Sequence, residues 1–125
     1  MSDSRKHLGK IGEEYASSFL RNLGYEIVDR NVRLPGGELD IVARDGGELV
    51  IIEVRSRKGK QKDISYGSPL ESITWRKQAK LRQLLIHYLQ QNQHVYNSFR
   101  IDVIGILFSP DLDAPPLFIE HVKHV

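Results

Sequence analysis

The 125-residue sequence contains no cysteine, and this absence removes several classes of function at once. Without thiols the chain has no disulfide framework, no thiolate zinc site and no cysteine nucleophile, and it suits a reducing cytoplasm. Any bound metal must take oxygen or imidazole ligands. The chain also lacks an apolar run long enough to span a bilayer, and its N-terminus opens on an amphipathic pattern instead of the apolar core of a signal peptide. We expect a soluble, unexported, cytoplasmic protein that does not bind membranes.

Linker-like composition and a strong net charge are missing as well. No Ser-, Pro- or Gly-rich stretch divides the chain, and a hydrophobic content of 40% suits one compact domain over residues 1–125. The formal net charge is only +2, so overall basicity does not argue for a polyanionic partner. The basic residues are unevenly placed, however. Between positions 55 and 62 there is no acidic residue, and the basic ones are Arg55, Arg57, Lys58, Lys60 and Lys62.

Hydrophobic periodicity predicts an α/β domain in the order α-β-β-β-α-β, with a mixed central sheet flanked by helices. The predicted elements are a helix from about residue 5 to 22 or 23, strands over 25–29, 38–44, 48–55, 99–107 and 117–122, and a second helix ending near 91. Gly24 is expected to end the first helix. The third strand is expected to be central, because its apolar run 49–52 is continuous. A polar loop over 56–67 leads to the second helix, which is capped at either Ser68 or Thr74.

Two acidic residues are predicted to converge on the second and third strands. Asp45-Gly46, between two β-rich runs, is a strong signal for a two-residue hairpin of type I′. In that register Asp40 pairs with Ile51, and Glu53 lies on the same face as both. A three-residue loop over 45–47 would instead place Asp40 and Glu53 on opposite faces unless a bulge corrected it.

Carboxylates gathered where a strand leaves the core are costly unless a cation offsets their repulsion. We therefore predict that Asp40 and Glu53 bind a hard metal ion, with Arg55 on the same face. The alternative is an ordinary ion-pair cluster, in which Arg55 or Arg57 pairs with Glu53. Glu13, at the border of the apolar face of the first helix, either reaches over the sheet edge in a functional role or is a solvated helix glutamate.

Several short motifs, taken in their order and spacing, resemble those of the YraN-like family of uncharacterised bacterial proteins. That family belongs to the restriction-endonuclease-like PD-(D/E)xK superfamily. The likeness covers nearly the whole chain. The residues that carry it are Gly12-Glu13, Asn31, Glu38-Leu39-Asp40, Glu53-Val54-Arg55-Ser56-Arg57, Lys77, Tyr88-Leu89 and the strand from Phe99 to Val103. The resemblance implies a nuclease fold related to archaeal Holliday-junction resolvases, with Asp40 and Glu53 as magnesium ligands and Glu13 as an auxiliary acid.

The sequence departs from the family pattern at one position, because the Glu-x-Lys motif is here Glu53-Val54-Arg55. In the superfamily this lysine helps to orient the attacking water and to stabilise negative charge on the reacting phosphate. An arginine stays protonated at any ordinary pH, so Arg55 suits electrostatic catalysis or phosphate binding and excludes proton abstraction.

Phosphodiester hydrolysis requires a nucleophilic water and charge stabilisation, and Mg²⁺ or Mn²⁺ held by carboxylates supplies both. Basic residues beside the two acids are predicted to follow a phosphate backbone, although such runs are often only solvated surface. These predicted nucleic-acid-binding residues are Arg57, Lys58, Lys60, Lys62, Arg76 and Lys77.

We therefore expect a magnesium-dependent, endonuclease-like protein that acts on DNA, branched DNA included. One alternative is a nucleic-acid-binding module on a nuclease scaffold, with catalysis impaired by Arg55. Another is a protein-interaction domain without a nucleic-acid role. The resemblance leaves a homodimer open, since junction-cutting relatives act as two-fold dimers.

Overall fold

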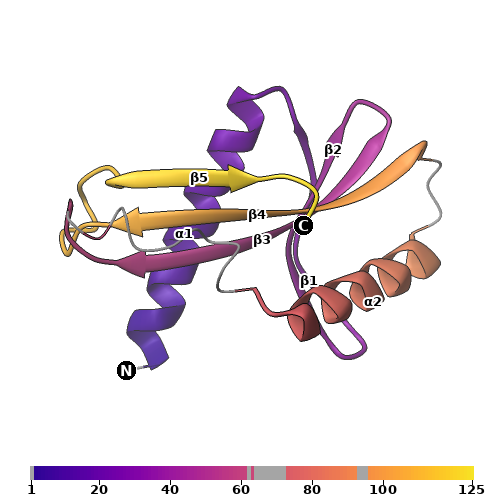
Figure 1. Ribbon diagram of the computed structural model, residues 1–125, viewed down its shortest axis with the longest axis horizontal. Coiled ribbons are helices and arrows are strands. Elements are labelled where there is room, and N and C mark those ends of the chain that lie inside the picture. Colours follow the sequence, from indigo (N-terminus) through magenta and orange to yellow (C-terminus); the bar gives the residue numbers. More distant parts are fainter. Residues whose placement is uncertain (1, 62, 64–72, 93–95) are drawn as a thin grey trace.

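The computed structural model describes residues 2–61, 63, 73–92 and 96–125 (Figure 1). Its elements are α1 (Ser2–Asn22), β1 (Glu26–Leu34), β2 (Gly37–Asp45), β3 (Glu48–Lys58), α2 (Trp75–Gln91), β4 (Ser98–Phe108) and β5 (Phe118–Val122). This order confirms the predicted α/β fold with a final edge strand. It agrees with the restriction-endonuclease-like core that the resemblance implies. Among the described residues, no helix is both long and apolar enough to cross a membrane.

The described strands form a single mixed sheet in the order β1-β2-β3-β4-β5. The hairpin pairs β1–β2 and β2–β3 and the edge pair β4–β5 are antiparallel, whereas β3 and β4 are parallel. Parallel neighbours require a crossover connection, and the segment containing α2 provides it. β3 is the middle strand, as its continuous apolar run predicted.

The two helices cover opposite faces of this sheet (Figure 1). Side chains of β3 alternate between them, as strand geometry requires. Val50 and Ile52 pack in the cluster that contains Ala16 and Leu20 of α1, and Leu49 and Ile51 pack in the cluster that contains Leu81, Leu84 and Tyr88 of α2. A strand buried on both faces has little room for polar side chains, and in β3 the first polar side chain after the apolar run is Glu53, the last buried residue before exposure rises at Val54.

The predicted elements differ most from the observed ones at the end of β1, which runs to Leu34 instead of residue 29, and next at the end of β3. Residues 56–58 were predicted to begin a polar loop, but they continue the strand, with Ser56, Arg57 and Lys58 paired to residues 106–108 of β4. Backbone pairing does not depend on apolar side chains, so the polar composition of residues 56–58 was a poor guide to where β3 ends.

At the start of α2, Thr74 is the N-cap, and its Oγ1 accepts a hydrogen bond from the Lys77 N–H at 3.1 Å. The alternative cap Ser68 lies outside the described residues.

Candidate functional site

The strands β2 and β3 stop pairing at the position of the two predicted acids. Their ladder ends with Ile41 opposite Ile52, and the next residues outward are Asp40 and Glu53. Past this point β2 remains paired with β1, and β3 remains paired with β4. Figure 1 shows the β3–β4 pair running across the view while β1 and β2 turn away from it. We call this division of the sheet the sheet fork, and Asp40 with Glu53 the acidic pair.

The turn that joins β2 to β3 differs from both predicted loops. It consists of Gly46-Gly47, so Asp45 is still a strand residue and pairs with Glu48. Both of these acids contact Arg100 of β4, with Asp45 Oδ2 at 3.4 Å and Glu48 Oε1 at 2.6 Å from its Nη1. These ion pairs keep both acids in the ladder and leave the two glycines for the loop.

This turn shifts the register by two residues from the predicted one, so Asp40 lies across from Glu53 and not from Ile51. Because side chains alternate with a period of two, an even shift preserves the predicted common face. The structure therefore brings the acidic pair closer together than the predicted register would have done.

A backbone hydrogen bond positions Asp40 at the sheet fork. The N–H of Val54 donates to Asp40 Oδ2 at 2.9 Å, so this carboxylate satisfies a β3 donor that has lost its ladder partner. Burial, and then the charge of Glu53, raises the pKa of Asp40 to about 6. The two carboxyl groups are therefore near enough to oppose each other's ionisation.

Glu53 is almost fully buried, with 7% of its surface exposed, and two cations approach it. Arg55 Nε and Lys77 Nζ each lie 3.6 Å from Glu53 Oε1. Arg55 is on the same strand, as predicted, whereas Lys77 reaches the acid from α2. The Glu53–Arg55 ion pair of the alternative interpretation is thus present, while Arg57 donates to the backbone oxygen of Asp63 at 3.0 Å.

Glu13 approaches the acidic pair from α1. The hydrogen-bonded partner of its side chain is Asn31, which adopts a left-handed backbone conformation with φ of 51°. Burial, and then the charge of Asp40, raises the pKa of Glu13 above its ordinary value. Non-glycine residues rarely adopt positive φ, and such residues concentrate at functional sites. Glu13 is therefore a half-buried acid near Asp40, in place of the solvated helix glutamate of the alternative prediction.

The close approach of α1 to β3 depends on Gly12. A Cβ at this position would overlap the Ser56 hydroxyl and lie 3.0 Å from the Ser56 Cβ. Only glycine lets the helix backbone lie against the strand here, and this contact places Glu13 beside the sheet fork.

The acidic pair has the chemistry of a two-ligand magnesium site. In the described part of the chain no group of three or more His, Cys, Asp or Glu side chains is arranged to hold a metal, so Glu13 does not complete a three-residue set. Mg²⁺ usually takes one or two carboxylates and fills its other positions with water and phosphate oxygens. Two opposed carboxylates, one with a raised pKa, therefore fit Mg²⁺ or Mn²⁺ better than they fit Zn²⁺, which prefers a closed set of nitrogen and sulfur ligands.

The predicted nucleic-acid-binding residues are distributed over two places. Lys77 faces the acidic pair, and Arg76 stacks over the exposed ring of Trp75, with its guanidinium carbon 5.7 Å from the ring centroid. The others that the structure describes are exposed at the end of β3 and in the turn after it, namely Arg57, Lys58 and Lys60. Lys62 lies outside the described residues.

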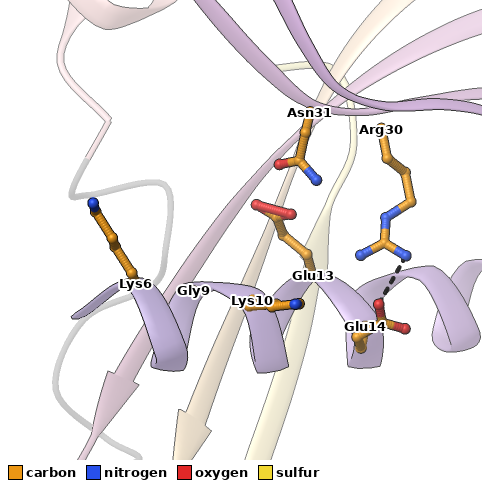
Figure 2. A pocket seen from close by; sticks show the side chains of 7 residues that line it. All are labelled: Lys6, Gly9, Lys10, Glu13, Glu14, Arg30 and Asn31. Atoms are coloured by element: carbon orange, nitrogen blue, oxygen red, sulfur yellow. Dashed lines mark ion pairs between the residues drawn. The ribbon is translucent and has the colours of Figure 1, made fainter. Parts of the chain in front are cut away.

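Sequence reasoning missed a pocket between α1 and β1, shown in Figure 2. Lys6 and Lys10 line it, and no pattern in the sequence distinguishes these lysines from ordinary surface residues. Asn31 also lines it, and its unusual backbone conformation is likewise invisible in the sequence.

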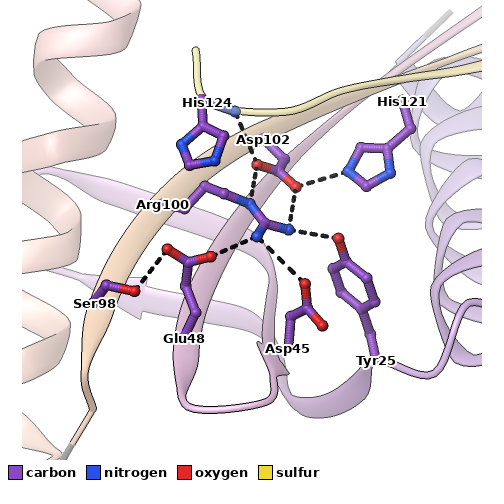
Figure 3. A network of polar contacts seen from close by, with 8 residues as sticks. All are labelled: Tyr25, Asp45, Glu48, Ser98, Arg100, Asp102, His121 and His124. Atoms are coloured by element: carbon purple, nitrogen blue, oxygen red, sulfur yellow. Dashed lines mark hydrogen bonds and ion pairs between the residues drawn. The ribbon is translucent and has the colours of Figure 1, made fainter.

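A second polar network surrounds Arg100, whose side chain is almost fully buried (Figure 3). Arg100 pairs with Asp102, with Arg100 Nε 2.9 Å from Asp102 Oδ1, and Arg100 also donates to the hydroxyl of Tyr25. His121 Nε2 lies 2.7 Å from Asp102 Oδ2. Burial raises the pKa of Asp102, but the hydrogen bonds from His121 and Arg100 outweigh burial and hold this pKa below its ordinary value. The ionic groups of this network pair with one another inside the fold, so we infer that the network stabilises the folded chain.

Comparison with known proteins places the chain among close relatives. A family described as "Uncharacterised protein family UPF0102" matches residues 12–106, which include both acids, Glu13 and Lys77. A UPF0102 protein of Acidothermus cellulolyticus is 42% identical over 98% of this chain and 95% of its own length. UPF0102 proteins of Desulforamulus reducens and Carboxydothermus hydrogenoformans are 43% and 44% identical, over 100% and 98% of this chain and 97% of their own lengths.

Proposed function

The chain belongs to the UPF0102 family along almost its whole length, and from its own site we propose that it is a metal-dependent nuclease of the PD-(D/E)xK type. Its reaction is the hydrolysis of phosphodiester bonds in nucleic acid, and DNA is the expected substrate. The observation that carries this proposal is the acidic pair at the sheet fork. Asp40 and Glu53 oppose each other across the two strands, and burial, followed by the charge of Glu53, raises the pKa of Asp40 to about 6.

Such an arrangement costs stability unless positive charge offsets it, and a metal ion would add to the charge that Arg55 and Lys77 already bring to Glu53. Asp40 and Glu53 would hold Mg²⁺ or Mn²⁺. When bound, the ion would supply Lewis acidity at the phosphodiester and would make a bound water more acidic. The protein positions the carboxylates: Val54 fixes Asp40, and burial in the sheet fixes Glu53.

Two cations next to the acidic pair provide the charge that a phosphoryl transition state requires. Arg55 takes the position of the lysine in the Glu-x-Lys motif, and its guanidinium offers positive charge without serving as a base. Lys77 brings a compact ammonium to the same carboxylate oxygen from α2, at the same 3.6 Å separation. We propose that Lys77 takes over the electrostatic part of the missing lysine's role. Glu13, whose pKa is raised, holds a proton more readily than an ordinary glutamate and is the auxiliary acid.

A cleavage assay tests this proposal. Labelled duplex, single-stranded and four-way-junction DNA are incubated with the protein and Mg²⁺ or Mn²⁺, and products are separated on denaturing gels. We expect cleavage that EDTA abolishes and that Asp40→Ala and Glu53→Gln each reduce at least about 100-fold, the scale expected for loss of electrostatic stabilisation at the reacting group. Asp113→Asn, an exposed acid in the chain segment before β5, is the matched control. Cleavage that survives Asp40→Ala unchanged contradicts the assignment.

A second function follows from the two cations at Glu53. Together they neutralise this acid without any metal, so the site also suits a nucleic-acid-binding module that has lost catalysis. This alternative predicts salt-dependent DNA binding without cleavage, and a gain of cleavage in Arg55→Lys. A wild-type enzyme that already cleaves, and that loses activity in Arg55→Lys, eliminates it.

A further inference from the structure

The α1–β1 pocket shares Glu13 with the surroundings of the acidic pair. It has a volume of about 610 Å³, within the usual range for ligand sites. Its lining comes from one side of α1 and from the middle of β1. The lining residues are Lys6, Gly9, Lys10, Glu13, Glu14, Arg30 and Asn31 (Figure 2).

Among the described residues, two lysines of the pocket have no ionic partner. Glu14 is matched by Arg30, whose Nη1 lies 3.1 Å from Glu14 Oε1. Lys6 and Lys10, one helical turn apart, form no ion pair within the described residues, and both are exposed. Lys6 extends upward from α1 along one side of the pocket in Figure 2. The pocket therefore presents two free cations one turn apart on the same helix.

The polar groups deeper in the pocket also point to a ligand. The Nε of Arg30 is buried and has no hydrogen-bond partner in the described part of the chain. A side chain built at Gly9 would meet nothing within 4 Å, so the helix surface is open there. Buried donors are rarely left unpaired in folded proteins, and a ligand oxygen would satisfy this one only if the Arg30 side chain turned its Nε toward the pocket that it lines.

The pocket is continuous with the acidic pair through Glu13. This residue lines the pocket, bonds to Asn31 and interacts electrostatically with Asp40, while Asp40 also interacts with Lys77 on the α2 side. Because the sheet divides at the fork, side chains from both helices reach the acidic pair. Cations thus lie on both sides of it, Lys77 and Arg55 on one side and Lys6 and Lys10 on the other.

We propose that the α1–β1 pocket binds a phosphate of the nucleic-acid strand next to the one held at the acidic pair, with Lys6 and Lys10 as its cationic contacts. This inference rests on the nucleic-acid-binding part of the proposed function and is independent of hydrolysis. It assigns a path to the strand, from the α2 side across the acidic pair into the pocket.

The test is the salt dependence of binding to a fluorescein-labelled single-stranded DNA, measured by anisotropy in EDTA so that no cleavage occurs. Each phosphate contact contributes about 0.7 to the slope of log K against log salt for a single strand. We expect the double variant Lys6→Ala/Lys10→Ala to reduce the wild-type slope by about 0.7, the contribution of the one phosphate held in the pocket. Lys6→Arg/Lys10→Arg should retain the wild-type slope, and so should Lys123→Ala, the removal of an exposed lysine elsewhere.

The outcomes separate the pocket from the catalytic proposal. Both lysines are exposed on a helix where alanine is favourable, so the double variant is expected to fold, and circular dichroism checks this. An unchanged slope in the folded double variant refutes the proposed phosphate contact in the pocket, even if the protein cleaves DNA through Asp40. Failure of the wild type to bind at low salt also overturns it. If the double variant reduces the slope but the wild type does not cleave DNA, phosphate binding in the pocket is supported and only the proposed hydrolysis is refuted.

Discussion

Replacing Asp40 by asparagine should make the protein more stable. Folding raises the pKa of this carboxyl from 3.8 to about 6. The folded state therefore binds the proton more tightly than the unfolded state, and the wild type loses stability as the pH rises from about 4 through about 6. At 1.36 kcal/mol per pKa unit the shift corresponds to about 3 kcal/mol above that range. Asparagine carries no charge at any pH, and its side-chain oxygen still accepts from the Val54 N–H.

The expected gain for Asp40→Asn is about 1 to 3 kcal/mol in the free energy of unfolding near pH 8, because screening by salt reduces the full value. The gain should fall to nearly zero below about pH 3, where the wild-type carboxyl is protonated in both states. Urea denaturation followed by circular dichroism, in EDTA and across this pH range, measures both quantities. Asp113→Asn, at an exposed carboxylate, should follow the wild-type profile.

The reasoning is refuted if Asp40→Asn is no more stable than the wild type near pH 8, or if the two pH profiles run parallel. Either result would mean that Asp40 is not destabilised by its surroundings. A gain that is the same at every pH would point to packing and not to charge.

Three further outcomes follow from contacts away from the acidic pair. Arg100→Met should lower the free energy of unfolding by roughly 3 kcal/mol in urea denaturation, since it leaves the wholly buried Asp102 without its main cation, and a loss below about 1 kcal/mol would contradict this. Asp102 has a lowered pKa, so the wild type should have a higher free energy of unfolding than Asp102→Asn at neutral pH, and this difference should shrink as the pH falls below 3.8. A difference that stays constant with pH would contradict the lowered pKa. Gly12→Ala should lower the free energy of unfolding by about 1 to 3 kcal/mol, because the added Cβ overlaps Ser56. In a double-mutant cycle Ser56→Ala should recover part of this loss, and additive effects of the two substitutions would exclude the overlap.

The order of elements and the shared face of the acidic pair were predictable because both depend on local pattern. Helical and strand periodicity identified the elements, and a continuous apolar run identified β3 as the central strand. The hairpin register was not predictable. Asp45 and Glu48 are held in the ladder by Arg100, which lies 52 residues beyond Glu48 in the chain. A local Asp-Gly turn signal contains no information about that partner.

The surroundings of the acidic pair depended on packing between distant elements. Lys77 was predicted to contact phosphate, but its approach to Glu53 follows from where α2 docks on the sheet. Asn31 bonds to Glu13 and has a positive φ, and although Asn tolerates that conformation better than most residues, strand periodicity does not indicate where it occurs. The α1–β1 pocket exists between two elements whose relative position the sequence pattern does not determine. The side chains around the acidic pair are therefore determined by how the helices pack on the sheet, which hydrophobic periodicity does not reveal.

The most direct test of the acidic pair as a metal site is a Mn²⁺ titration, in which electron paramagnetic resonance measures the ion left free in solution. We predict one Mn²⁺ bound per wild-type chain at neutral pH, with affinity reduced at least about tenfold in Asp40→Asn and in Glu53→Gln, a loss of roughly 1.4 kcal/mol or more. Asp113→Asn should bind like the wild type. Absence of binding to the wild type, or equal binding to Asp40→Asn, would contradict a metal centre at the sheet fork.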